Sequence, residues 1–142
     1  MHPDFVILGR LVVAGLLAAV LGWEREQAGK SAGLRTHMLV GIASALYTGL
    51  AEIAAAELGA GRADPIRAVQ AVAMGIGFLG GGMIFVSRNT DRVRGLTTAA
   101  SIWATAAMGV AAGLAHFRLA AGATVLLAVV LHVLARFEQD QQ

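Results

Sequence analysis

The sequence is poor in the residues that a soluble protein places at its surface. It has no cysteine and two prolines, and only 14% of its residues are charged and 6% aromatic. The absence of cysteine excludes disulfide bonds. A soluble domain of this length carries about a quarter charged residues, so this chain has too few of them to cover a water-facing surface.

Apolar residues make up 57% of the 142 residues, and the mean hydropathy is +0.69. We therefore expect an integral membrane protein. The sequence pI of about 9.9 arises from basic residues in short connectors, without a basic stripe or interleaved aromatic residues, so no nucleic-acid partner is expected. Because the N-terminus lacks a basic region and Arg10 interrupts the first apolar run, we also expect no cleaved signal peptide.

Five apolar segments are long enough to cross a bilayer, which takes about 17–25 residues. They are Phe5–Trp23, Met38–Leu58, Ile66–Val86, Leu96–Ala115 and Leu119–Phe137. Lipid requires the backbone to satisfy its own hydrogen bonds, and the sequence has no strand-length alternation, so each segment is expected to be a helix. The predicted fold class is an all-α integral membrane protein, a bundle of about five transmembrane helices.

Lysine and arginine are divided unevenly between the two sides of such a bundle. The side of the first and third connectors and of the C-terminus has Arg25, Lys30, Arg35, Arg88, Arg92, Arg94 and Arg136. The other side has Arg62, Arg67 and Arg118. The positive-inside rule therefore predicts that the N-terminus lies outside and the C-terminus in the cytoplasm.

The second segment has one polar stripe, whose members are spaced by three or four residues. The stripe consists of His37, Gly41, Ser44, Thr48 and Glu52. This spacing places them on one face of a helix, which could line a hydrated path or pack against another helix. Glu52 and Arg10 are expected at similar depths near the outer boundary. There they could form an ion pair, or Arg10 could reach the lipid headgroups independently.

Asp64 and Pro65 directly precede the third segment and suit the N-cap and the first position of its helix. Its run Gly75–Gly80 matches G-x-G-x-x-G, but no strand precedes it, so a dinucleotide site is rejected. Gly77 and Gly81 are expected to permit close helix contact.

The triplet Gly80–Gly82 in the same segment could loosen or break the helix, or serve close packing alone. Gln70 shares a face with Gly77 and Gly81, and its polar side chain is expected to point inward.

The fourth segment has a row of small residues that offers a ridge to a neighbouring helix. The row consists of Thr97, Ser101, Thr105, Gly109 and Gly113. Arg94 lies at the mouth of this segment, where basic residues could bind an anion, a lipid headgroup or an acidic partner. Simple anchoring to anionic lipid is the preferred interpretation of Lys30, Arg88 and Arg92.

The sequence contains neither the residue pattern of a metal site nor that of a catalytic site. Of the four histidines, only His37 and His132 fall near the same membrane level, and no carboxylate cluster accompanies them. No nucleophile is paired with a base. We expect no metal, no cofactor and no enzymatic activity.

Three long motifs follow one another along the chain. The first is Gly22–Glu26, with Glu24 and Arg25, then Lys30 and Ala32–Val40, with Arg35, Thr36 and His37. The second is Asp64–Arg67, Gln70 and Gly75–Gly80; the third is Gly95–Ser101, with Thr97 and Thr98, followed in register by Trp103 and Thr105. In order and spacing they resemble the MgtC/SapB membrane proteins of bacteria. Met74 and Gly81 depart from the serine and alanine usual there.

The resemblance implies a single membrane domain over residues 1–142, located in the bacterial inner membrane. It also implies a link to growth in low magnesium and to survival of pathogens inside host cells. Members of the family are thought to act by restraining the F-type ATP synthase more than by carrying magnesium. Many members have a soluble C-terminal domain, which this chain is expected to lack because it ends soon after Phe137.

Two functions are consistent with these features. The preferred one is a non-enzymatic regulator that docks a membrane protein, with a homo-oligomer also open. The alternative is an ion (Mg²⁺ or H⁺) or small-solute transporter or channel. Its lining would consist of His37, Ser44, Thr48, Glu52, Gln70 and Thr97.

Overall fold

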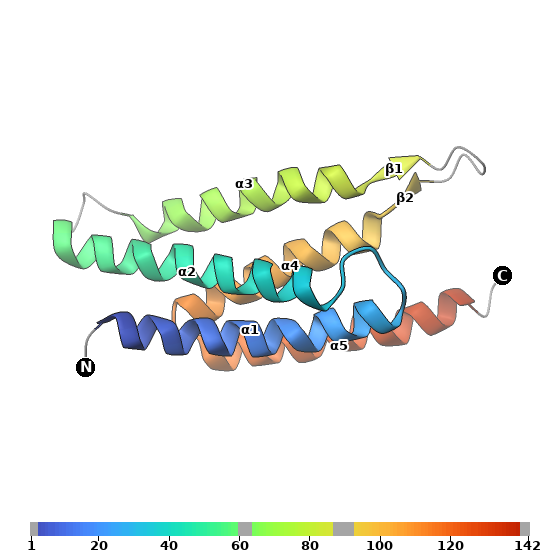
Figure 1. Cartoon of the computed structure of the whole chain (residues 1–142), viewed down its shortest axis with the longest axis horizontal. Helices are drawn as coiled ribbons and strands as arrows, with labels where there is room; N and C mark the ends of the chain where they lie inside the picture. The colour runs from blue at the N-terminus through green and yellow to red at the C-terminus, as the bar shows by residue number, and fades with distance from the viewer. Residues whose placement is uncertain (1–2, 60–63, 87–92, 140–142) are drawn as a thin grey trace.

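The computed structural model describes residues 3–59, 64–86 and 93–139, with side chains from Asp4 to Val133 outside the two gaps. These residues form five helices: α1 (Pro3–Gln27), α2 (Leu34–Leu58), α3 (Pro65–Met83), α4 (Leu96–Gly113) and α5 (Phe117–Gln139). Successive helices run in alternating directions as one bundle (Figure 1). The predicted all-α fold is confirmed.

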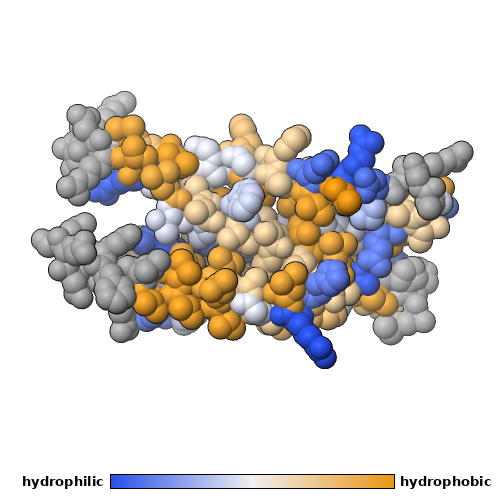
Figure 2. Space-filling model, turned by 180° about the vertical axis from the view of Figure 1, so that it is seen from behind, coloured by the Kyte–Doolittle hydropathy of each residue, from blue (hydrophilic) through white to orange (hydrophobic). Residues whose placement is uncertain are grey.

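Four of the helices, α1 to α4, are long and apolar enough to cross a membrane. In α5 the part with described side chains, Phe117–Val133, is apolar but shorter. Large apolar side chains such as Phe5, Leu16 and Phe78 are exposed on the outside of the bundle. Apolar and weakly polar residues cover most of the face seen in Figure 2, and strongly hydrophilic residues gather mainly toward its right-hand end. Such a surface is favourable in lipid and costly in water, so the chain is a multi-pass membrane protein.

The central helix of the bundle is α4, which packs against α1, α2, α3 and α5. The main core is built from small side chains around one methionine, which lets the helix backbones approach closely. It consists of Ala14, Ala18, Ala45, Met108, Ala112 and Ala120. A second apolar cluster joins Val72 and Ile76 of α3 to Val40 of α2 and Ala106 of α4.

The two ends of the bundle differ in charge. At one end, which we call the basic end, lie Arg25, Lys30 and Arg35 around the α1–α2 connector and Arg94 before α4. The opposite end, which we call the N-terminal end, has the start of α1, the end of α2 and the α4–α5 turn (Figure 1).

A two-stranded hairpin that the sequence did not predict follows α3 at the basic end. Strand β1 (Phe85–Val86) pairs antiparallel with β2 (Val93–Arg94), with Phe85 opposite Arg94 and Val86 opposite Val93. The third segment was predicted to be helical as far as Val86, and this boundary is wrong. The helix ends at Met83 because the following residues form their hydrogen bonds with β2 instead.

The glycine triplet Gly80–Gly82 does not break α3, contrary to one of the two expectations. All three residues are helical, and the N–H of Ile84 donates to the Gly81 oxygen at 3.3 Å just beyond the helix end. Glycine lowers helix propensity by about 1 kcal/mol per residue, but a broken backbone in lipid would leave several polar groups unsatisfied. The second cost is the larger one, so the helix continues.

Candidate functional site

The polar stripe of α2 lies inside the bundle, between α1 and α4. His37, Gly41, Ser44 and Thr48 are buried, whereas Glu52 is exposed. On one side, a Cβ atom added to Gly41 would lie 2.8 Å from the Cβ of Ala18 in α1. The stripe is thus covered by packed helices, which is the packing interpretation that the sequence left open beside the hydrated path.

The other side of the stripe contacts two glycines of α4. A Cβ atom on Gly109 would lie 2.5 Å from the Gly41 carbonyl oxygen and 3.0 Å from the Ser44 Cβ. A Cβ atom on Gly113 would collide with the Thr48 hydroxyl. The predicted ridge of α4 is therefore the surface against which the α2 stripe packs.

Three buried hydroxyl groups of this interface donate to the backbone of their own helices. Thr48 Oγ1 donates to the carbonyls of Ser44 and Ala45, each at 3.1 Å. Ser101 Oγ donates to Thr98 O and Thr105 Oγ1 donates to Ser101 O, both at 2.8 Å. Hydroxyls bonded in this way satisfy their protons within the helix and tolerate burial in an apolar core.

His37 connects α2 to α4 by hydrogen bonds at the basic end. Its ring is fully buried, with Nδ1 3.0 Å from Gly33 O and Nε2 3.3 Å from Ser101 Oγ. Because a carbonyl oxygen only accepts, Nδ1 bears the proton, and in a neutral ring Nε2 is then an acceptor. The single proton of Ser101 can serve either Nε2 or Thr98 O. The sequence singled out both residues but did not pair them.

At the N-terminal end, Arg10 and Glu52 form an ion pair between α1 and α2, as the sequence analysis suggested. Arg10 Nη1 also donates to the Gly113 carbonyl at 2.8 Å. That carbonyl belongs to the last residue of α4 and has no partner within its helix. Arg10 therefore caps the C-terminus of α4 in addition to linking α1 to α2. The side chain of Arg10 is 12% exposed and that of Glu52 is 50% exposed.

At the basic end, the motif Glu24-Arg25-Glu26 occupies the last turn of α1. Glu26 accepts a hydrogen bond from the Leu34 N–H at 2.8 Å and thereby caps α2, whose N-cap Gly33 has no side chain to do so. Arg25 is 2% exposed, and its Nη1 lies 3.6 Å from Glu24 Oε2. Its Nε and Nη2 have no hydrogen-bond partner among the described residues.

A cavity of about 560 Å³ opens beside this arginine. It lies between the α1–α2 connector, the hairpin and the first turn of α4. Its polar lining includes Arg25, Lys30, Ser31, Arg94, Thr97 and Thr98.

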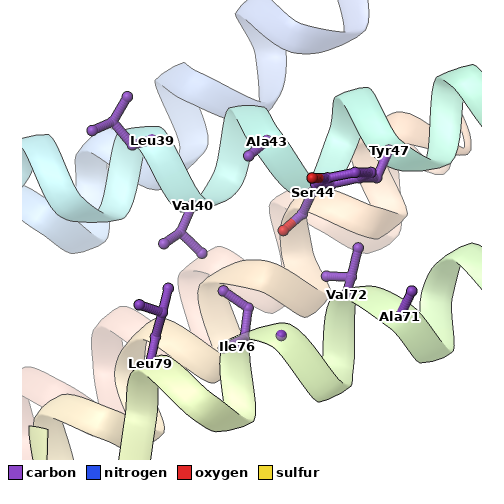
Figure 3. A pocket seen from close by; sticks show the side chains of 10 residues that line it. Leu39, Val40, Ala43, Ser44, Tyr47, Ala71, Val72, Ile76 and Leu79 are labelled. Carbon is purple, nitrogen blue, oxygen red and sulfur yellow. The ribbon is translucent and has the colours of Figure 1, made fainter. Parts of the chain in front are cut away.

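A second, apolar groove of about 500 Å³ separates α2 from α3 (Figure 3). Val40 of α2 faces Val72 and Ile76 of α3 across it, and the Ser44 hydroxyl points toward it. Ser44 and Tyr47 are the hydroxyl-bearing residues among those that line this otherwise apolar groove, and two hydroxyls without a carboxylate provide no set of ligands for an ion. Within the described part of the chain, no three His, Asp or Glu residues lie close enough together to hold a metal.

Several predicted residues of α3 lie elsewhere than expected. Gln70 is exposed, which corrects the expectation that it points inward. A Cβ atom on Gly75, Gly77 or Gly81 would meet no atom of the described bundle within 4 Å, so these glycines make no close contact inside it, and close contact with a further helix stays a prediction. The reason is geometric. The face of α3 that packs against the bundle contains Ile76 and Gly80, and the residue that follows each of them is rotated away from this face by about 100°.

The remaining predicted residues lie at the helix ends. Asp64 caps α3 by accepting from the Ile66 N–H at 2.9 Å. Arg35, Arg67 and Thr97 are exposed, Thr36 is half-buried, and Gly80 would place a Cβ atom 3.6 Å from that of Ala99. Gln70 and Thr97 therefore do not join the α2 stripe in one lining.

Comparisons with known proteins agree with the three motifs. The sequence profile of the MgtC family matches residues 11–140. The chain is similar to the putative magnesium transporter YhiD of Escherichia coli (strain K12), with 41% identity over 136 residues, 94% of this chain and 61% of YhiD. It is 41% identical to protein SrpB of Synechococcus elongatus over 111 residues, 73% of this chain and 61% of SrpB.

A third relative is protein MgtC of Brucella abortus (strain 2308), which is 39% identical over 120 residues, 84% of this chain and 48% of that protein. The chain spans between about half and three fifths of the length of these relatives. No solved structure gives a significant match.

Proposed function

The chain belongs to the MgtC family, and on this premise we propose that it is a non-enzymatic protein of the bacterial inner membrane that acts in magnesium homeostasis. The name of the similar YhiD protein, putative magnesium transporter, supports the connection with magnesium. The excess of lysine and arginine around the first connector supports an orientation with the basic end in the cytoplasm.

We propose further that the protein regulates a membrane partner by helix contact. The observation that supports this role best is the closed interface between α2 and α4. Gly109 lies so near Gly41 that a single added methyl group would collide with the backbone. A conducting path along the stripe would require these two helices to separate and their buried hydroxyls to exchange backbone partners for water.

The surface proposed for the partner is the outward face of α3. Phe78 is 84% exposed, Met74 is exposed beside it, and Gly77 and Gly81 have free space around their Cα atoms. Helices in lipid associate where small residues allow close approach next to larger side chains. The family resemblance supports the F-type ATP synthase as the partner, and a second copy of the chain would present the same chemistry.

The test uses two glycines that differ only in location. A Cβ atom added to Gly77 on α3 or to Gly122 on α5 would meet no atom of the described bundle within 4 Å, so the two positions are matched in their surroundings. We expect Gly77→Leu to abolish rescue of a deletion strain in low magnesium, whereas Gly122→Leu retains it at equal protein level. ATP-driven proton pumping in inverted vesicles should be restrained by the unmodified chain and by Gly122→Leu only. Equal activity of both variants would exclude the α3 face.

A transporter is the second candidate, because the similar YhiD protein is named a putative magnesium transporter. It is tested by Mg²⁺ and H⁺ flux into proteoliposomes that hold the purified chain, with Glu52→Gln alongside. Flux that this substitution abolishes would replace the regulatory proposal with a transport function. Correctly inserted protein without flux would support the regulator.

A further inference from the structure

We propose that the cavity at the basic end is a binding site for a phosphate-type oxyanion, held between Arg25 and the first turn of α4. The cavity measures about 560 Å³, which accommodates a phosphate group together with part of the molecule that bears it. Two parts of the chain that are distant in sequence meet around it: the end of α1 with its connector, and the strands β1 and β2 with the start of α4, which follows β2 directly.

The start of α4 supplies unpaired backbone donors. Its first hydrogen bond runs from the Ala99 N–H to the Gly95 oxygen at 2.8 Å, so the N–H groups of the three preceding residues have no partner inside the helix. The N-cap Gly95 has no side chain to accept from them. An α-helix of 18 residues also concentrates about half a positive charge at this terminus, which favours an anion.

The buried guanidinium of Arg25 is an independent indication of a ligand. Its side chain is 2% exposed and lines the cavity, yet Nε and Nη2 have no partner among the described residues. The Glu24 carboxylate lies 3.6 Å from Nη1, which is longer than a well-formed hydrogen bond, and it does not pair with Nε or Nη2. Buried N–H groups of a charged side chain are costly when unpaired, so a ligand that accepts from them would stabilise this arrangement.

The charged side chains among the described lining residues are all positive. Arg25, Lys30 and Arg94 contribute three cations, and the described residues that line the cavity include no carboxylate. These side chains and the helix N–H groups are donors, so the site suits a ligand with several acceptor oxygens and negative charge. Thr97 and Thr98 add hydroxyl groups at the same helix start. A phosphate or a phospholipid headgroup meets this description.

Non-specific anchoring to anionic lipid would use these cations differently. Anchoring requires exposed charge near the headgroups and depends on the number of cations more than on their positions. Burial of Arg25 beneath the surface does not contribute to such an effect. The two interpretations therefore predict different effects when exposed arginines at the basic end are replaced. Anchoring depends on how many cations remain, whereas a binding site depends on which arginine is lost.

Arg94 and Arg35 provide the comparison. Both are exposed at the basic end, but Arg94 lines the cavity and Arg35, in the first turn of α2, does not. The first arm measures binding of inorganic phosphate to the detergent-purified full chain by calorimetry, at constant ionic strength with chloride as the control. The second arm measures retention of phosphatidylglycerol by native mass spectrometry after transfer from nanodiscs of phosphatidylcholine and phosphatidylglycerol.

We expect saturable binding in at least one arm. Arg94→Gln should weaken it about tenfold, because one charge-assisted contact is lost, and Arg35→Gln should leave it unchanged. Binding in the first arm identifies a free oxyanion as the ligand, and binding in the second arm alone identifies a lipid headgroup. Arg25→Lys, which keeps the charge but not the planar donor set, should weaken binding as well.

Two results would overturn the site. One is equal weakening of binding by Arg35→Gln and Arg94→Gln, because binding would then depend only on the number of cations at the basic end. The other is the absence of binding in both arms by protein whose helical content is unchanged. Because these measurements use purified protein and no partner, they are independent of the low-magnesium growth test, and either proposal can fail while the other stands.

Discussion

The same substitution, glycine to alanine, is expected to have opposite effects at two positions of this bundle. At Gly109 in α4 the added Cβ would lie 2.5 Å from the Gly41 oxygen and 3.0 Å from the Gly41 Cα. At Gly77 in α3 it would meet nothing within 4 Å. Both residues lie inside helices with ordinary helical backbone, so helix propensity contributes equally at the two positions.

The magnitudes follow from these contacts. At Gly77, alanine improves helix propensity and restricts the unfolded chain, which stabilises by about 0.4–1 kcal/mol. At Gly109 the same gain is present, but α2 and α4 must separate, since the obstructing atoms are backbone atoms that have no alternative rotamer. Overpacking of this kind costs about 1–3 kcal/mol. Because the gain is common to both variants, they should differ by the overpacking cost alone, about 1–3 kcal/mol in the free energy of unfolding.

The assay is equilibrium unfolding of the purified chain in mixed micelles, followed by circular dichroism as the denaturing detergent is increased. Gly109→Ala should unfold at a lower detergent fraction than the unmodified chain, and Gly77→Ala at an equal or higher one. If Gly109→Ala were as stable as Gly77→Ala, the α2–α4 contact would not be the packed interface described above. A water-filled path along the stripe, which tolerates an added methyl group, would then be the better explanation.

Three further predictions concern single contacts. In a double-mutant cycle, Arg10→Ala and Glu52→Ala should show a coupling of about 0.5–1 kcal/mol, modest because the carboxylate is half exposed; simple additivity would exclude the ion pair. Gly95→Ala should lower the amount of folded protein in the membrane, because Gly95 has a left-handed φ of 89° and its Cβ would collide with the Met83 carbonyl; normal levels would contradict this backbone geometry. Glu26→Ala should cost about 1 kcal/mol in the unfolding assay, and Glu26→Gln, which retains an acceptor for the first N–H of α2, should cost less.

The positions of the membrane helices could be predicted from the sequence because the signal is local. The second segment was expected to end at Leu58, and α2 ends there; the expected start of α3 at Asp64 and Pro65 is also where the helix begins. The end of the third segment was misjudged because Phe85 and Val86 are apolar in either conformation. Only their pairing with β2, which lies further along the chain, determines that they are strand.

The candidate site could be predicted only in part. The helical period placed His37 and Thr48 on one face of α2, and burial of that face followed from its polarity in lipid. The partners of the face could not be read in the same way. The contact of His37 with Ser101 and the donors left unpaired on Arg25 depend on which helices lie side by side, and on their rotation.

The sequence by itself determined the membrane class, the approximate helices, the family and the polar face of α2, because hydropathy, periodicity and motif order are properties of the chain read in one dimension. Only the tertiary structure determined which glycines contact a neighbouring helix. Gly77 and Gly109 look equivalent in sequence, yet one faces open space and the other touches a neighbouring backbone. Close approach is a relation between two helices, and a rotation of about 100° per residue is enough to create or abolish it.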